Sequence, residues 1–200
     1  ARQEIGGEFV QIEGAEFPAE WFDWPGFWFD EWPAGCRAKC VYLDPSKGAS
    51  ETSDFQAIVQ AALAVIEGRN TILLDAHINR EPVTAMVARA IRVARSWEPV
   101  DALGFEDNGT MGFLDPEFAR QMTDAGVLQP WVPITNRDPK IQRIRRVGAY
   151  LSRHQVRIRN TPGGHLLRAQ LGDVPLGEHD DGPDAAAGAI DLLERCLMEV

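Results

Sequence analysis

The sequence lacks several features that would assign it to a class of protein at once. It has no apolar run of the roughly 18 residues that a membrane-spanning helix needs, and its polar opening, ARQEIGGEF, does not resemble a secretion signal. Its three cysteines, Cys36, Cys40 and Cys196, lack the paired spacing of a zinc site or a disulfide framework. The G-x-x-x-x-G-K-[ST] phosphate loop of ATP-driven motors is also absent. We therefore expect a cytosolic protein with free thiols and no ATPase activity of its own.

Positive charge is scarce in the chain as a whole but concentrated in one segment. The 20 Lys and Arg against 30 Asp and Glu give a net charge of −10, which by itself argues against a polyanionic partner such as DNA. Between Arg137 and Arg159, however, Asp138 is the one acid among many basic residues. This segment predicts a basic face that contacts the DNA backbone; the alternative is a solvated helix with outward arginines. The best candidates for DNA contact are Lys140, Arg143, Arg146 and Arg153.

The pattern of apolar residues predicts an α/β domain after an aromatic-rich N-terminal segment. Residues 1–38 show no helical or strand periodicity, and we interpret them as a linker or N-terminal extension packed by its aromatic side chains. Strands are predicted near residues 39–44, 55–62, 70–78, 102–106 and 154–160, of which the second is ambiguous with a helix. Helices are predicted near residues 83–97, 115–125, 140–151, 165–171 and 184–198. Residues 39–200 therefore form the predicted folded domain.

Acidic residues recur where predicted strands end and where the last helix begins. Asp44 follows the strand CVYL, Glu106 follows ALGF, and Asp180, Asp181 and Asp184 open the last helix. Strand ends in an open sheet share an edge, so these carboxylates can converge, and converging carboxylates need a cation such as Mg²⁺ or Mn²⁺. The alternatives are local roles: a turn former at Asp44, a solvated end of a strand at Glu106, and caps of the last helix.

Two further residues have open assignments. Asp75 lies on a predicted core strand, where it points either toward the acidic residues or toward the following loop. His179 precedes the double Asp, where it either orients a water or touches phosphate, or is an exposed loop histidine.

Three segments, in this order and at these spacings, resemble the C-terminal nuclease domain of the large terminase subunit of tailed bacteriophages. They are YLDPSKGASETSDFQAIV, LGFEDNGT and GEHDDGPDAAAGAI, and the segments ILLDAHINREP and FPAEWF resemble the family less specifically. The resemblance implies a ribonuclease H-like fold with a central mixed β-sheet flanked by helices. It also implies an endonuclease that cuts concatemeric double-stranded viral DNA during genome packaging by hydrolysis with two Mg²⁺ or Mn²⁺ ions.

Carried over by position, the resemblance assigns the site residues. It implies Asp44, Glu106 and Asp181 as catalytic metal ligands, with Asp44 bridging both ions. Asp184 matches a further acidic position that some members use as a ligand. Asp180 is either a metal ligand or a residue that contacts the ligands without touching the ion.

The resemblance also implies partners and leaves two other functions open. The implied partners are double-stranded DNA, an ATPase domain of the same polypeptide that this chain lacks, the portal and the small terminase subunit, all in the cytoplasm of the bacterial host. One alternative is a different nuclease of the same fold, such as a ribonuclease H or a junction resolvase. The other is a non-catalytic module that binds DNA or docks onto the packaging motor.

Overall fold

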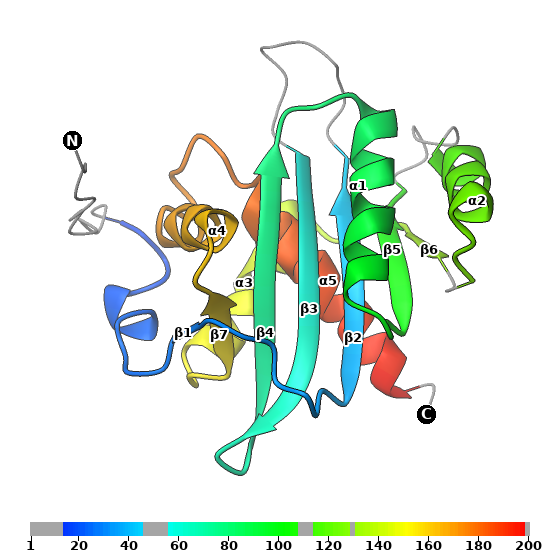
Figure 1. Ribbon diagram of the computed structural model, residues 1–200. Coiled ribbons are helices and arrows are strands. Elements are labelled where there is room, and N and C mark those ends of the chain that lie inside the picture. Colours follow the sequence, from blue (N-terminus) through cyan, green and yellow to red (C-terminus); the bar gives the residue numbers. More distant parts are fainter. Residues whose placement is uncertain (1–13, 46–55, 108–113, 129–130, 199–200) are drawn as a thin grey trace, which may run out of the picture.

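The computed structural model describes residues 14–45, 56–107, 114–128 and 131–198 (Figure 1). Its core is a seven-stranded mixed sheet with the order β1-β7-β4-β3-β2-β5-β6. β3 is antiparallel to both of its neighbours, and the remaining neighbours pair in parallel. The strands are β1 (Trp28–Phe29), β2 (Ala38–Asp44), β3 (Gln56–Ile66), β4 (Arg69–Asn79), β5 (Ala102–Glu106), β6 (Trp131–Ile134) and β7 (Val156–Arg159).

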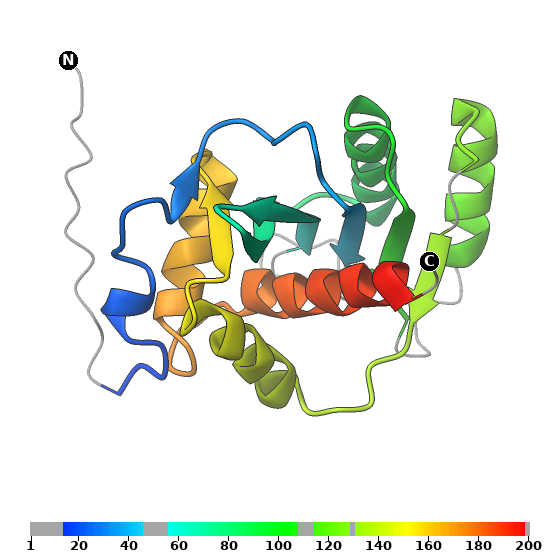
Figure 2. The ribbon, with the colours of Figure 1, turned by 90° about the horizontal axis from the view of Figure 1, so that it is seen from below.

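Helices flank this sheet, as Figure 2 shows in the view along its strands. The helices are α1 (Val83–Ser96), α2 (Leu114–Ala125), α3 (Lys140–Leu151), α4 (Pro162–Gly172) and α5 (Asp181–Met198). α5 runs along one face of the sheet with α3 packed behind it, whereas α1 covers β2 on the opposite face. The predicted mixed sheet flanked by helices is therefore confirmed.

Both faces of the central strands are buried, and alternate side chains pack into the core under α5 and into the core under α1. On β2, Cys40 and Tyr42 pack under α5, whereas Val41 and Leu43 pack under α1. Small residues let α5 approach closely: a Cβ built on Gly188 would lie 2.4 Å from the ring of Tyr42. The close packing of α5 brings its first turn over the ends of β2 and β5, so side chains from all three elements can meet there.

The N-terminal segment belongs to the packed structure from residue 14 on. Phe22 and Phe27 are fully buried, and Trp28 and Phe29 form β1, which pairs with β7. The aromatic side chains therefore pack as predicted, although the short strand was not predicted. The role of this segment as a linker to another domain stays a prediction.

Two differences from the predicted elements have a local explanation. β6 was missed because Trp131–Ile134 is short and contains Pro133, which is tolerated here because β6 lies at the edge of the sheet. β3 extends to Ile66 because Glu67 and Gly68, both with positive φ, form a tight turn into β4. Among the described residues, no helix is both long and apolar enough to cross a bilayer.

Candidate metal centre

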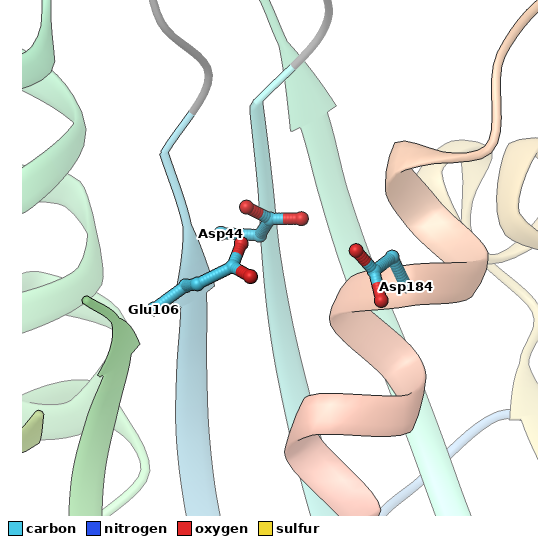
Figure 3. A group of neighbouring side chains, drawn as sticks. All are labelled: Asp44, Glu106 and Asp184. Carbon is cyan, nitrogen blue, oxygen red and sulfur yellow. The ribbon is translucent and has the colours of Figure 1, made fainter. Parts of the chain in front are cut away.

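Three carboxylates converge where β2, β5 and α5 meet. Asp44 is the last residue of β2, Glu106 is the last residue of β5, and Asp184 lies in the first turn of α5. One oxygen from each lies within 4.8 Å of the others. Figure 3 shows the carboxylates of Asp44 and Glu106 pointing toward each other, with Asp184 facing them from the helix.

The sheet register explains why the first two carboxylates meet. β2 and β5 are parallel neighbours in which Leu43 pairs with Phe105, so the next residue of each strand reaches the same edge. Both carboxylates face α5, because side chains alternate along a strand and Tyr42, two residues before Asp44, packs under that helix. The positive end of the α5 dipole lies at the same place and favours negative charge there.

The electrostatics of the centre call for a cation. Asp44 is only 9% exposed, and its burial raises the pKa of its carboxyl well above the usual value. A hydrogen bond and the negative charge from Glu106 raise this pKa further. Burial also raises the pKa of Asp184, although Arg143 opposes the shift. A hard divalent cation would relieve the repulsion among these groups, and three carboxylates are a donor set that such an ion accepts.

Arg143 holds two of the three carboxylates in place. Its Nε and Nη2 donate to the two oxygens of Asp184 at 2.9 and 2.5 Å, and Nη2 lies 3.5 Å from Glu106. Asn136 donates to the same oxygen, Glu106 Oε1, at 2.9 Å. Arg143 was predicted to contact DNA, but its side chain is buried and directed into the acidic centre, where a DNA phosphate would have to displace a carboxylate.

Lys140 faces the remaining acidic residues at the start of α5. Its Nζ lies 2.7 Å from Asp180, 3.6 Å from Asp181 and 3.8 Å from Asp184. Burial alone would lower the pKa of this lysine, but the hydrogen bond to Asp180 and the neighbouring negative charges raise it to about 12. Lys140, also predicted to contact DNA, therefore remains charged and directed toward α5.

The structure places Asp184, rather than Asp181, beside Asp44 and Glu106. The two aspartates are three residues apart in the first turn of α5 and share one side of the helix, with Asp181 at the start of the turn and Asp184 at its end. Lys140 lies within 4 Å of both aspartates, but only Asp184 belongs to the group of three neighbouring carboxylates. Asp180 is half exposed and directed toward Lys140 as well. The assignment of Asp181 as third ligand stays a prediction, and the geometry makes Asp184 the alternative.

The other two predicted DNA contacts, Arg146 and Arg153, are exposed on α3 and the turn after it. They line a groove of about 290 Å³ between α3 and α5. Arg146 already pairs with Asp138 at 2.8 Å and lies 3.8 Å from Asp191. Their contact with DNA remains a prediction.

Asp75 and the cysteines lie outside the centre. Asp75 is buried, accepts from the Thr161 hydroxyl at 2.6 Å, and lines a cleft of about 790 Å³ above β4. Cys40 packs under α5, whereas Cys36 packs in a separate cluster, so they share no metal site.

His179 is partly buried and lies beside Asp180 at a small cavity. Sequence reasoning missed Asn136 and the orienting role of Arg143, because neither lies in an acidic motif.

Comparisons with known proteins identify the fold. No protein-family model and no curated protein sequence matches the chain. A manganese-soaked, inhibitor-bound human cytomegalovirus terminase nuclease domain superposes with a TM-score of 0.56 at 14% identity, over 79% of this chain and 83% of that one. The magnesium-bound large terminase nuclease of the thermophilic phage G20c gives 0.53 at 16% identity, over 81% and 84%.

A whole large terminase gives a similar result. The protein from the HK97 bacteriophage superposes with a TM-score of 0.55 at 12% identity, over 78% of this chain but 39% of that one. The chain therefore has the ribonuclease H-like fold of terminase nuclease domains, as the resemblance in its sequence implied.

Proposed function

We propose that this domain is a divalent-metal-dependent endonuclease that cleaves double-stranded viral DNA by hydrolysis. The observation that carries the proposal is the convergence of Asp44, Glu106 and Asp184 at the end of the sheet. Structures of the same fold, solved with manganese or magnesium, are terminase nuclease domains, which supports both the reaction and the type of ion.

The residues have separate tasks in this proposal. Asp44, Glu106 and Asp184 hold two Mg²⁺ or Mn²⁺ ions, which when bound lower the pKa of a water and stabilise charge on the phosphodiester. Arg143 orients Asp184 and Glu106, and Asn136 also donates to the Glu106 oxygen that Arg143 approaches. These hydrogen bonds and the ion pair limit the freedom of the carboxylates before any ion binds.

The wider assignment also remains a proposal. We infer that the domain works as part of a large terminase that cuts concatemeric DNA during packaging in the cytoplasm of the bacterial host. Its proposed partners are an ATPase domain of the same polypeptide, the portal and the small terminase subunit. The likeness to part of the HK97 large terminase, 39% of whose chain is covered, supports a place within a longer terminase chain.

Plasmid nicking tests the proposal. With Mn²⁺, the parent domain should convert supercoiled plasmid into nicked and linear forms, and EDTA should stop the reaction. Asp44→Asn should abolish nicking while the circular dichroism spectrum is kept. Asp124→Asn, an exposed carboxylate on α2, is the matched control and should cut like the parent. Equal nicking by the parent and Asp44→Asn would show that the acidic centre does not catalyse the reaction.

Substrate choice separates the alternatives. The proposed enzyme should prefer duplex DNA over an RNA–DNA hybrid or a four-way junction of the same length. Preference for the hybrid or the junction would instead indicate a ribonuclease H or a resolvase. DNA binding without metal-dependent cutting of any of the three would favour the non-catalytic module.

The third ligand is tested by metal binding. Titration calorimetry with Mn²⁺ should show a larger loss of affinity for Asp184→Asn than for Asp181→Asn, because Asp184 adjoins the other two carboxylates whereas Asp181 lies three residues before it, outside that group. The opposite order would restore Asp181 as the ligand.

A further inference from the structure

The first turn of α5 is held by a side chain of α4. The Gly182 amide donates to Gln170 Oε1 at 3.0 Å, and this hydrogen bond is buried. The first N–H groups of a helix have no partner within the helix, so a bond of this kind supplies one from outside. The next residue, Pro183, has no N–H, and the Asp184 amide donates to the carbonyl of Asp180 at 3.0 Å. Gln170 therefore caps the turn that carries Asp184.

The bond to α5 accounts for a glutamine at this buried position. Gln170 is only 6% exposed, and its Nε2 has no hydrogen-bond partner among the described residues. Burying an amide is unfavourable unless it is hydrogen-bonded, so packing alone would favour an aliphatic side chain here. A Cβ built on Gly182 would overlap Gln170 Oε1 and lie 2.8 Å from Ile78 Cδ1. The glycine thus lets the start of α5 come within hydrogen-bond reach of the amide.

α4 is itself fixed to the sheet at its start. Thr161, the N-cap of α4, donates to the buried carboxylate of Asp75 on β4 at 2.6 Å. A Cβ built on Gly163 would overlap the carbonyl oxygen of Ala76, so the helix begins against the backbone of β4. Since α4 is anchored in this way, Gln170 presents its oxygen to α5 from a fixed position.

The capped turn is the one that brings Asp184 to the acidic centre. Asp184 follows Gly182 by two residues, and Figure 3 shows its carboxylate facing those of the two strand ends. Arg143 holds the Asp184 carboxylate, whereas Gln170 holds the backbone that carries it. Helix ends fray, so a bond from outside to an N–H group of the first turn limits the movement of that turn.

We infer that Gln170 is a positioning residue of the acidic centre. Through its bond to Gly182 it holds the first turn of α5, so that Asp184 stays beside the carboxylates at the ends of β2 and β5. The inference rests on the proposed function for the identity of the ion. Loss of the bond would weaken the binding of a divalent ion without removing any carboxylate.

Metal binding by a matched pair of variants tests this role. Gln170→Met removes the acceptor but keeps the length of the side chain, and Gln60→Met makes the same change on β3, at a glutamine that is also 6% exposed. Titration with Mn²⁺, followed by the electron paramagnetic resonance signal of the free ion, gives the affinity even where binding is weak. Gln170→Met should bind Mn²⁺ about threefold to tenfold more weakly than the parent, less than the roughly 10–100-fold expected for a direct partner of a ligand. Gln60→Met should bind like the parent.

A double variant tests whether the effect passes through Asp184. In the Asp184→Asn background, Gln170→Met should change the Mn²⁺ affinity by less than about twofold, because the carboxylate that the turn carries is already gone. Equal losses in both backgrounds, an unchanged affinity in Gln170→Met, an equal loss in Gln60→Met, or a parent that binds no Mn²⁺ would each overturn the inference.

Amide exchange tests the cap without any metal. In EDTA, the Gly182 amide proton should exchange about tenfold faster or more in Gln170→Met than in the parent, and at the parent rate in Gln60→Met. Gln170→Glu keeps an acceptor oxygen and should retain the slow exchange. Parent-like exchange in Gln170→Met, or equally fast exchange in Gln170→Glu, would show that this bond does not hold the turn.

These measurements are separate from the test of catalysis. Mn²⁺ binding that depends on Gln170 in a domain that never nicks plasmid would keep the positioning role and refute the nuclease. Nicking by a domain whose Mn²⁺ affinity is the same with and without Gln170→Met would refute the positioning role alone.

Discussion

α1 and α3 are both amphipathic helices with arginines at helical spacing, yet their charges meet different surroundings. On α3, Arg143 pairs with Asp184, Arg145 with Glu16 and Arg146 with Asp138. On α1, the two outermost arginines face solvent. The positive charge of α3, the more prominent basic segment in the sequence, is therefore largely neutralised by acids from other parts of the chain. The positive charge of Arg92 and Arg95 on α1 is not.

The difference arises from where each helix packs. α3 lies against α5, whose first turn contains Asp181 and Asp184, and beside the N-terminal segment with Glu16. α1 packs on an apolar part of the sheet and beside α2. Net charge along a segment thus predicts a binding face only when the acids brought near it by folding are counted.

The largest effect on stability is expected at Arg143. Arg143→Met should lower the free energy of unfolding in EDTA by roughly 3–5 kcal/mol, because Asp184 and Glu106 would keep buried negative charges without their partner. Urea denaturation measures the change. A decrease in the free energy of unfolding of less than about 1 kcal/mol, as for a surface ion pair, would mean that the ion pairs of Arg143 stabilise the fold no more than those of the exposed arginines.

Lys140 should have a smaller effect on stability but a clear effect on metal binding. Lys140→Met removes a cation 3.8 Å from Asp184, so Mn²⁺ should bind several-fold more tightly in calorimetry. Since the pKa of Lys140 is about 12, the gain should be the same throughout neutral and mildly alkaline pH. Arg146→Met is the control on the same helix. An equal gain in Mn²⁺ affinity for this variant would show that the effect comes from the net charge of the domain and not from the position of Lys140.

The stabilising contribution of Lys140 itself has a defined pH dependence. Because its pKa in the folded protein lies above the ordinary value, its ion pairs stabilise the fold below about pH 10, and this contribution is lost as the pH rises through about 12. The difference in unfolding free energy between the parent and Lys140→Met should shrink over that interval. A difference that grows with pH would contradict the ion pairs of this lysine with α5.

The exposed ion pairs of α3 should contribute less. Arg145→Ala, which breaks the pair with Glu16, should cost about 0–1 kcal/mol, and the cost should fall as salt is added. Thermal unfolding at low and high ionic strength measures both. A cost that high salt leaves unchanged would point to packing of the aliphatic stem instead.

The smallest change in stability is expected on α1. Arg92→Ala should alter the free energy of unfolding by no more than about 0.5 kcal/mol, since the side chain is exposed and forms no ion pair with the described residues. Urea denaturation of this variant, compared with that of Arg143→Met, measures the difference between an exposed and a buried arginine. Strong destabilisation would mean that Arg92 packs within the protein.

Much of the sheet was predictable because its strands have simple local patterns. The strands ending in Asp44 and Glu106 are short apolar runs bounded by turn residues, and their parallel pairing brings both carboxylates to one edge. α1 followed from apolar residues at intervals of three and four. β1 and β6 were missed because two and four residues carry too little pattern and gain their stability from pairing with neighbouring strands.

The sequence by itself determined the strand ends, the helical faces and the acidic residues from which a metal centre can form, since these depend on side chains near in the chain. Only the tertiary structure decided that Asp184 rather than Asp181 adjoins Asp44 and Glu106, and that Arg143 faces inward while Arg92 and Arg95 face outward. The physical reason is that these outcomes depend on how the first turn of α5 lies above the sheet and on which carboxylates folding places beside each arginine. Both follow from long-range packing, which a single sequence does not display.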